Sequence, residues 1–329
     1  EALAAAGTMG LRNVVLHVDW NQASIDSNRV CREGGQPGEY VQWDPAELAY
    51  LHDWNVISVP DGRDFAQILD AQARARSLDN GQPTAIVYRT VKGWQYGIEG
   101  RASHGAGHKL CANGFYDAVE TLLDQQSGPL PRCSGDEKRC RGCDPVIIEA
   151  CYWQALQAVR ASLTADTAVV SGLCDELQAA RDRLAARRRT VRADAPQLER
   201  AYALSAKKTP PELGLAPGTS TTLRAALGDA IQHLNQVSGG GFLVAAADLL
   251  GSTSVSNAAR GFPEGFWHAA TNPKARVLSI GGICEDAMAA LLAGLSTYGY
   301  HLGAGSSYAA FIAPLSHIAA RLHAIGGQA

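Results

Sequence analysis

The segment Asp19-Trp20-Asn21-Gln22-Ala23-Ser24-Ile25-Asp26 carries the first residues that could do chemistry. It lies at the carboxyl end of a predicted strand over residues 13–20, where open α/β sheets bind their ligands. An Asn amide oxygen and a turned backbone carbonyl are hard oxygen ligands, which Mg²⁺ or Ca²⁺ accepts beside a phosphate. The alternative is an Asx-type turn closed by Asn21 and Asp26 without any ligand. Taken alone, the segment favours the turn.

A second group follows the predicted strand over residues 84–88. It consists of Thr90-Val91-Lys92-Gly93-Trp94 and then of Glu99-Gly100-Arg101-Ala102-Ser103-His104-Gly105-Ala106-Gly107-His108-Lys109. Glycines let backbone N–H groups approach an anion, and two histidines with two cations suit phosphate binding or proton transfer. The alternative is an exposed loop whose histidines do no chemistry.

The third group is Gly281-Gly282-Ile283-Cys284-Glu285-Asp286-Ala287-Met288, which follows a predicted strand over residues 276–280. A carboxylate in the first turn of a helix is stabilised by the helix dipole, so Glu285 can simply cap the helix. The residues after it are apolar, which would place Glu285 at the mouth of a buried unit. There a desolvated carboxyl group can hold an unusual proton.

Cysteines gather in one part of the chain. Eight cysteines in 329 residues are too few for a disulfide scaffold, but four of them fall within residues 133–151. Cys140 and Cys143 have the C-x2-C spacing of a zinc knuckle, with Cys133 and Cys151 as further candidate ligands. The alternative is a surface insertion that carries free thiols.

The elements expected to position these residues alternate between strand and helix. An Ala-rich helix end over residues 1–11 precedes strands at 13–20, 56–59 and 84–88, with a helix at 64–78. Residues 114–203 are predicted to be helical, and 207–218 form a linker rich in Pro and Gly. A second block has helices at 221–236, 285–295 and 308–325, the first capped by Thr219 or Ser220 and the last kinked at Pro314, and strands at 242–246 and 276–280. This order predicts two α/β blocks with parallel sheets, joined by a helical segment and a linker.

Composition and charge exclude several classes of partner. Lys and Arg number 29 and Asp and Glu 32, which gives a formal charge of −3, so we expect no nucleic-acid binding. The arginines at 181–189 are interpreted as a solvated helix face. No charged residue lies between Asp286 and Arg321, but polar and Gly residues interrupt this stretch, so we expect a fully buried helix–strand–helix unit and no membrane span. No basic leader precedes an apolar core at the start, which predicts a cytoplasmic protein.

In this order and spacing, the three groups resemble the transketolase family of thiamine-diphosphate enzymes. The resemblance covers residues 1–104 and again about 221–329. It implies that residues 1–126 are the C-terminal part of the diphosphate-binding domain and 219–329 part of the pyrimidine-binding domain. Residues 127–218 would be a helical connector with the Cys-rich insertion and the linker. The expected fold is therefore α/β, with two domains of the type that binds thiamine diphosphate.

The resemblance also implies roles for single residues around the cofactor. Asn21 and the backbone carbonyl of Ala23 would hold the Mg²⁺ (or Ca²⁺) that binds the diphosphate. Asp248 would contact the cofactor. Glu285 would hydrogen-bond a nitrogen of the pyrimidine ring and favour the imino tautomer, whose nitrogen removes the thiazolium proton. The cofactor would carry the carbanion chemistry.

Substrate contacts and the subunit arrangement follow from the same resemblance. His104 would lie near the diphosphate and the reacting substrate oxygen, and Arg224 and Ser252 would contact the substrate phosphate. The site would form between two subunits, which predicts a homodimer with a large apolar interface. Two departures from the family pattern stand out. The Gly-Asp-Gly metal motif is not in this sequence, and Tyr308 and Phe311 are the only aromatic residues where the family packs rings against the pyrimidine.

Three functions are consistent with these features. The first is a transketolase-like transfer of a two-carbon ketol unit between sugar phosphates. The second is the homodimeric pyruvate-decarboxylating component of a 2-oxo acid dehydrogenase, which the segments 91–94, 99–101 and 220–222 partly resemble. The third is a non-catalytic assembly protein that retains the fold.

Overall fold

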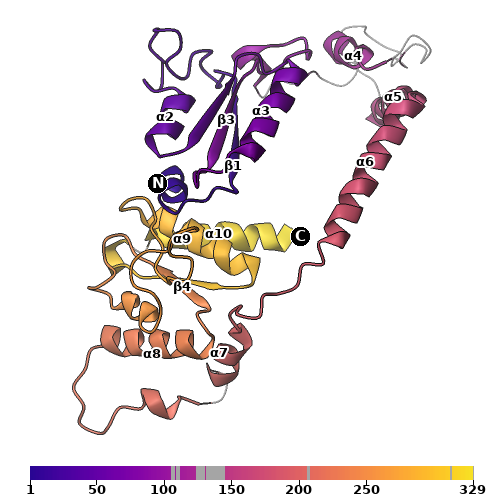
Figure 1. The fold of residues 1–329 in the computed structure, drawn as a ribbon. Helices are drawn as coiled ribbons and strands as arrows, with labels where there is room; N and C mark the ends of the chain where they lie inside the picture. Colours follow the sequence, from indigo (N-terminus) through magenta and orange to yellow (C-terminus); the bar gives the residue numbers. More distant parts are fainter. Residues whose placement is uncertain are drawn as a thin grey trace.

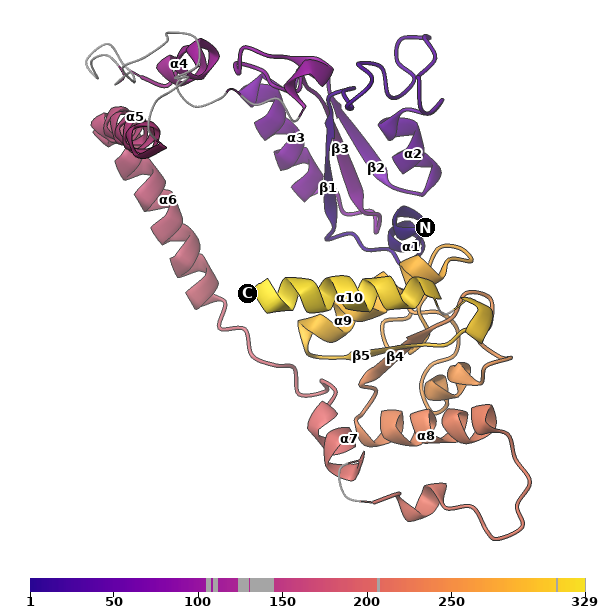
Figure 2. The same cartoon turned by 180° about the vertical axis from the view of Figure 1, so that it is seen from behind.

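The protein folds into two α/β units, each built on a parallel sheet, and a helical arm lies between them in the sequence (Figures 1 and 2). The computed structural model describes residues 1–104, 108, 112–123, 130, 145–205, 208–311 and 313–328. Within these residues no helix is both long and apolar enough to span a bilayer.

The first unit holds a three-stranded sheet in the order β1-β3-β2. Its strands are β1 (Val15–Trp20), β2 (Asn55–Val59) and β3 (Thr84–Arg89), close to the predicted ranges. The strands are parallel, and Trp20 pairs with Arg89 at the carboxyl end. Helix α3 (Phe65–Ser77) covers the face of Ile86 and Tyr88, while α2 (Pro45–Leu51) packs on the Ala85 face. The central strand β3 is therefore buried on both sides.

Helix starts in this unit follow the capping residues. Asp64 caps α3 by accepting a hydrogen bond from Ala66 N at 2.9 Å, as the predicted start at residue 64 requires. Helix α2 is not among the predicted elements. Its signal is present all the same, because Asp44 precedes Pro45 and accepts a bond from Glu47 N at 2.8 Å.

The second unit contains α8 (Leu223–Val237), β4 (Phe242–Ala245), α9 (Glu285–Tyr298), β5 (Leu302–Gly305) and α10 (Ala313–Gln328). Strands β4 and β5 pair in parallel, with Ala245 opposite Gly305. The predicted helix–strand–helix unit is α9-β5-α10. Its expected full burial is wrong, because only Met288 and Leu292 of α9 are buried.

Three predictions in this unit need correction. The strand predicted at 276–280 is reduced to one bridging residue, Val277, which pairs with Val244 on one side and with Phe266 on the other, because neither pairing continues along the chain. The cap of α8 is Thr222, whose hydroxyl accepts from Ala225 N at 3.3 Å. Pro314 does not kink a helix. It lies in the first turn of α10, where a missing N–H costs nothing.

Helix α1 (Ala2–Thr8) packs into both units. Ala6 joins Ala49 and Trp54 in the core of the first unit, and Ala5 lies with β4 and α9 residues in the core of the second. Met9, directly after the helix, also belongs to the second core, and its carbonyl accepts a bond from Ala269 N at 2.9 Å. The first ten residues thus connect the two units.

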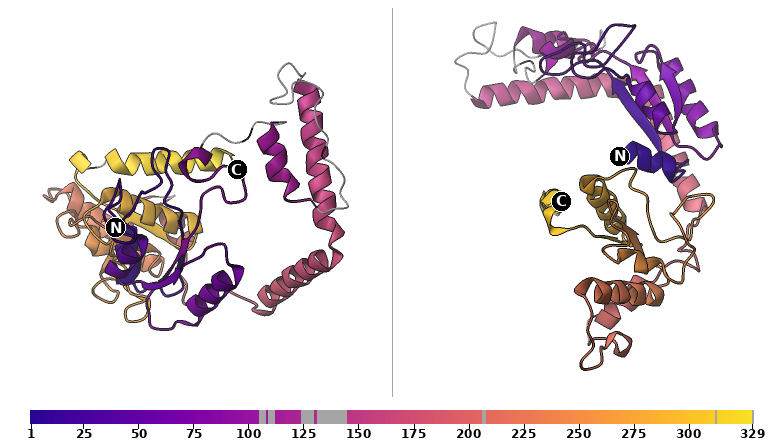
Figure 3. Two further views of the ribbon diagram at one scale, coloured as in Figure 1. Left: turned by 90° about the horizontal axis from the view of Figure 1, so that it is seen from above. Right: turned by 90° about the vertical axis from the view of Figure 1, so that its left-hand side faces the viewer.

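The arm consists of separate helices, where the sequence predicted helical structure over 114–203. These are α4 (Asn113–Glu120), α5 (Pro145–Ala165), α6 (Thr167–Ala186) and α7 (Leu198–Ser205). Outside these helices, the described residues also form four 3₁₀ turns: η1 (Gly100–Ser103), η2 (Pro211–Leu213), η3 (Val255–Ala259) and η4 (Ala309–Phe311). Figure 3 shows α6 lying apart from both units.

Candidate functional site

The first group of candidate residues lies where β1 and β3 end, and we call it the β1–β3 edge: Asp19, Asn21, Ala23, Thr90, Lys92 and His104. Because Trp20 pairs with Arg89, the chain leaves both strands at the same edge of the sheet. Asp19 accepts hydrogen bonds from the Thr90 hydroxyl and, at 2.9 Å, from Asn21 Nδ2. One carboxylate therefore connects the two loops.

Asn21 forms the Asx turn that the sequence offered as an alternative. Its Oδ1 accepts a hydrogen bond from Ala23 N at 2.9 Å. Asp26 does not take part in the turn; the Ser24 hydroxyl instead accepts from the backbone N–H of Asp26 and, at 3.0 Å, of Ser27. An amide oxygen has two lone pairs, so the turn leaves Asn21 Oδ1 able to bind a cation.

Two further contacts fix this loop. Gln22, with φ of 59°, is buried and exchanges hydrogen bonds with the backbone of Cys31 at 2.8 and 3.0 Å. Asn28 Oδ1 accepts from Arg101 N at 2.7 Å, which ties the loop to η1. His104 follows η1 directly. The structure therefore brings Asn21 and His104 to one edge of the first unit.

His104 is exposed, and its Nδ1 lies 2.8 Å from Lys92 Nζ. An ammonium group only donates, so in this contact Nδ1 is the acceptor. The sequence analysis counted Lys92 among the cations of the loop but did not foresee this contact.

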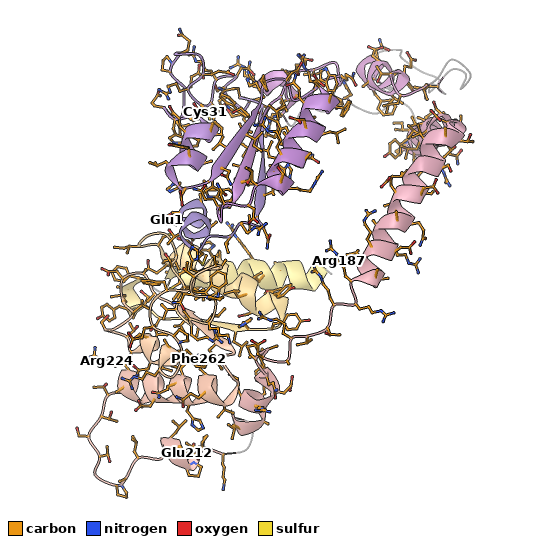
Figure 4. All side chains as sticks on the ribbon, viewed as in Figure 1. Glu1, Cys31, Arg187, Glu212, Arg224 and Phe262 are labelled. Atoms are coloured by element: carbon orange, nitrogen blue, oxygen red, sulfur yellow. The ribbon has the colours of Figure 1, made fainter. Side chains whose placement is uncertain are left out.

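A cavity of about 430 Å³ adjoins Asn21 between β1 and α2. Cys31 lies on its wall (Figure 4). Burial, with a smaller contribution from Asp44, raises the pKa of the Cys31 thiol. The thiol therefore stays protonated near neutral pH, which makes it a poor nucleophile and a poor metal ligand.

The second group lies where β4 and β5 end, and we call it the β4–β5 edge: Asp248, Glu285 and Ser307. Glu285 is the first residue of α9 and is half-buried. Its Oε1 accepts a hydrogen bond from the Ser307 hydroxyl at 2.9 Å. Ser307 follows β5, as Asp248 follows β4, and the pairing of Ala245 with Gly305 brings these loops to one edge. Nothing in the sequence pattern singled out Ser307.

A cavity of about 390 Å³ lies at this edge and is lined by Asp248, Gly281 and Gly282 among others. Gly281 has φ of 78°, and a Cβ atom there would lie 2.4 Å from the carbonyl oxygen of Glu1. Only glycine fits this turn without strain. The turn thereby brings the start of α1 against the wall of the cavity, four residues before α9 begins.

Arg224 and Ser252, the predicted phosphate contacts, lie side by side. Arg224 NH1 donates to the carbonyl oxygen of Ser252 at 3.1 Å, and the arginine is exposed at the start of α8 (Figure 4). This contact brings together two residues 28 positions apart.

The two edges are not joined within one chain. In the described residues no hydrogen bond or ion pair connects Asn21 or His104 with Asp248 or Glu285. Figure 2 shows the loop after β1 at the end of the first unit that faces away from β4.

The described residues do not hold a full set of ligands for either candidate metal site. No cluster of three or more His, Cys, Asp or Glu side chains suited to a metal ion occurs among the residues described. Of the predicted zinc ligands, Cys133, Cys140 and Cys143 lie outside the described residues, and Cys151 lies in α5 as a free cysteine. At the β1–β3 edge, the amide and carbonyl oxygens of Asn21 and Ala23 match the ligand type that Mg²⁺ accepts, with further ligands needed from elsewhere.

Comparison with known proteins identifies the first unit. The family model described as transketolase, thiamine diphosphate binding domain, matches residues 1–115. Transketolase 1 of Pasteurella multocida is 32% identical over 110 residues, which is 32% of this chain and 15% of that protein. A plasmid-encoded transketolase of Cupriavidus necator is 35% identical over 108 residues, again 15% of its length.

Solved structures extend the likeness in fold to most of the chain. A transketolase from Pichia stipitis in complex with sedoheptulose 7-phosphate matches 97% of this chain with a TM-score of 0.59 at 17% identity. A Campylobacter jejuni transketolase matches 96% with a TM-score of 0.58 at 20% identity. The chain spans 42% of each of these structures. Residues 1–115 therefore match the model of the transketolase thiamine diphosphate binding domain, and the chain as a whole has a fold similar to the α/β fold of transketolases.

Proposed function

We propose that this chain is part of an enzyme that uses thiamine diphosphate to transfer a two-carbon ketol unit between sugar phosphates. The proposal rests on one observation, namely that the candidate residues lie at the carboxyl edges of the two parallel sheets. Asn21 and His104 lie at the carboxyl edge of one parallel sheet, and Glu285 lies at the carboxyl edge of the other. Ligands of α/β sheets bind at such edges. Since the edges are separate in one chain, we propose a homodimer in which they face each other across two subunits.

The β1–β3 edge would hold the diphosphate end of the cofactor. Asn21 Oδ1 and the Ala23 carbonyl would bind Mg²⁺ (or Ca²⁺) beside the diphosphate. Asp19 would keep Asn21 oriented, because it accepts from Nδ2 at 2.9 Å and leaves Oδ1 on the other side of the amide. The bound cofactor supplies the electron sink for carbanion chemistry.

The β4–β5 edge would hold the pyrimidine end. Ser307 donates to one oxygen of Glu285, which fixes the carboxyl group and leaves its second oxygen for a ring nitrogen. Asp248 would line the approach to this group. At the opposite edge, Lys92 contacts Nδ1 of His104, so Nε2 is the ring nitrogen that would hydrogen-bond the reacting substrate oxygen.

Sugar phosphates are the substrate class that the remaining residues support. Arg224 donates to the backbone at Ser252, and its other N–H groups are available to a phosphate. The Pichia stipitis transketolase, which shares the fold, was solved with sedoheptulose 7-phosphate.

The proposal is tested by substituting two neighbouring carboxylates, Glu285 and Asp286, one at a time in the full-length protein. We expect Glu285→Gln to lower ketol transfer by roughly a hundredfold or more, because the amide cannot supply the proton that the cofactor ring needs. Asp286→Asn is the matched control. Asp286 is exposed and contacts His317 of α10, away from Ser307, so its variant should keep wild-type turnover.

Other outcomes of the assay would point elsewhere. Wild-type turnover in Glu285→Gln, with circular dichroism unchanged, contradicts the assigned role. Release of CO₂ from pyruvate without a sugar-phosphate acceptor would favour the pyruvate-decarboxylating enzyme. If calorimetry detects no binding of thiamine diphosphate with Mg²⁺ to the full-length protein, the assembly function is favoured instead.

A further inference from the structure

Helix α6 has an apolar stripe that nothing covers in the described part of the chain. None of its residues is buried, and Figures 1 and 3 show it apart from both units. Its apolar residues recur at alternating steps of three and four. We call them the α6 seam: Val170, Leu173, Leu177, Ala180 and Leu184. Leu173, Leu177 and Leu184 are 60%, 62% and 66% exposed.

This spacing is that of the a and d positions of a heptad repeat. Residues so spaced form a narrow strip on one side of a helix, which packs against a second helix by inserting knobs into holes. The exposed leucines at 173, 177 and 184, with Ala180 on the turn between the last two, leave a continuous apolar strip, and such a strip on a helix indicates a partner.

The charges on α6 indicate which partner fits. Its N-terminal half carries acidic groups only, at Asp175 and Glu176, with Asp166 as the N-cap. Its C-terminal half and the residues after it are basic, with a single acidic residue, Asp182. The arginines there are Arg181, Arg183, Arg187, Arg188 and Arg189. Arg187 lies at the end of the helix in Figure 4. A second copy in antiparallel orientation would therefore bring each acidic half beside a basic half.

A parallel pair would have the opposite effect. It would bring the arginine-rich ends of both copies together and would align the two helix dipoles. Like charges at facing positions are destabilising. The antiparallel arrangement also lets Leu173 of one copy pack near Leu184 of the other, with Leu177 and Ala180 at the centre. Glu176 then lies near Arg183 of the second copy.

We propose that α6 is a self-association surface that pairs antiparallel with α6 of a second copy of this chain. The pairing uses neither of the edges described above, so it goes beyond the proposed function and stands or falls separately. A seam of fewer than three heptads gives a small interface, and we expect association to weaken on dilution.

The first test is sedimentation velocity of the full chain over a range of concentrations. The variant with Leu173→Asp and Leu177→Asp should lose one association step, with its dissociation constant raised roughly a hundredfold by the lost apolar burial. Leu69→Asp is the matched control, since Leu69 is a comparably exposed leucine on α3. Ser171→Asp, on the polar side of α6, controls for the added charge. Both controls should associate like the wild type. Unchanged association of the double variant overturns the proposal, as does a wild type with no association step.

Orientation is tested by the distance between spin labels at Thr167, introduced as a non-natural amino acid at the first residue of α6. With a rise of 1.5 Å per residue, the antiparallel arrangement places the two labels about 35 Å apart. A parallel pair places them within about 20 Å, given helix axes 8–10 Å apart. The longer distance supports the proposal, and the shorter one overturns it.

Discussion

Replacing Gly281 by alanine should destabilise the protein far more than the same change at Gly299. Both glycines have positive φ, 78° and 88°, so each alanine incurs a similar conformational cost of about 1–2 kcal/mol. The surroundings differ. A Cβ at Gly281 would lie 2.4 Å from Glu1 O and 2.5 Å from Ala5 N, whereas nothing lies within 4 Å of a Cβ at Gly299.

The atoms that a Cβ at Gly281 would meet belong to the backbone of α1, which cannot move without disturbing both cores. Overpacking of this kind costs about 1–3 kcal/mol. We therefore expect a total loss of about 2–5 kcal/mol for Gly281→Ala and about 1–2 kcal/mol for Gly299→Ala.

The measurement is urea unfolding followed by circular dichroism, with both variants compared to the wild type. Equal losses at the two positions would refute the argument, because they would mean that α1 does not press on the turn at Gly281. The larger loss should also come with a changed cavity at the β4–β5 edge, since Gly281 lines it.

Two further predictions concern the second unit. Asn235→Ala should lower the free energy of unfolding in urea by about 2–4 kcal/mol. Asn235 is fully buried, and its side chain forms hydrogen bonds with Phe242 N, Phe242 O and Ala258 O, which would lose their partner. Gln236→Ala, on the exposed side of α8, is the control and should lower it by less than about 1 kcal/mol. The pKa of His301 is lowered by burial and by Arg276 and Arg192. The unfolded chain therefore binds a proton before the folded one does, and stability should fall as the pH drops below about 6.5. His301→Gln should show a shallower fall over that window, and an identical pH profile for both proteins would contradict the assignment.

The sequence predicted elements best where a local signal decides them. Asp64 marks the start of α3, and the β-branched run at residues 84–88 is the central strand β3. Prediction from the sequence failed where residues far apart in the chain determine the local structure. The apolar run at 276–280 has the composition of a strand, yet only Val277 pairs, in isolated bridges with Val244 and Phe266, because neither neighbour continues the pairing. Pro314 was placed inside a helix because the pattern alone did not show that the helix begins beside it.

The candidate site divides in the same way. Asn21, His104 and Glu285 could be picked out because each follows a predicted strand closely in sequence. Their partners could not. Thr90 reaches Asp19 across 71 positions and Ser307 reaches Glu285 across 22, and only the register of the paired strands brings these residues together. Sequence periodicity contains no information on that register between distant strands.

The double packing of α1 has a consequence for how the molecule unfolds. Seven residues at the start of the chain fill space in two hydrophobic cores that otherwise share little. Opening either core strips α1 of half its contacts and weakens the other, so heat or denaturant should melt both sheets together in one cooperative step. Helix α1 thus holds the two sheets together. As long as it stays packed, the β1–β3 edge and the β4–β5 edge keep a constant orientation relative to each other.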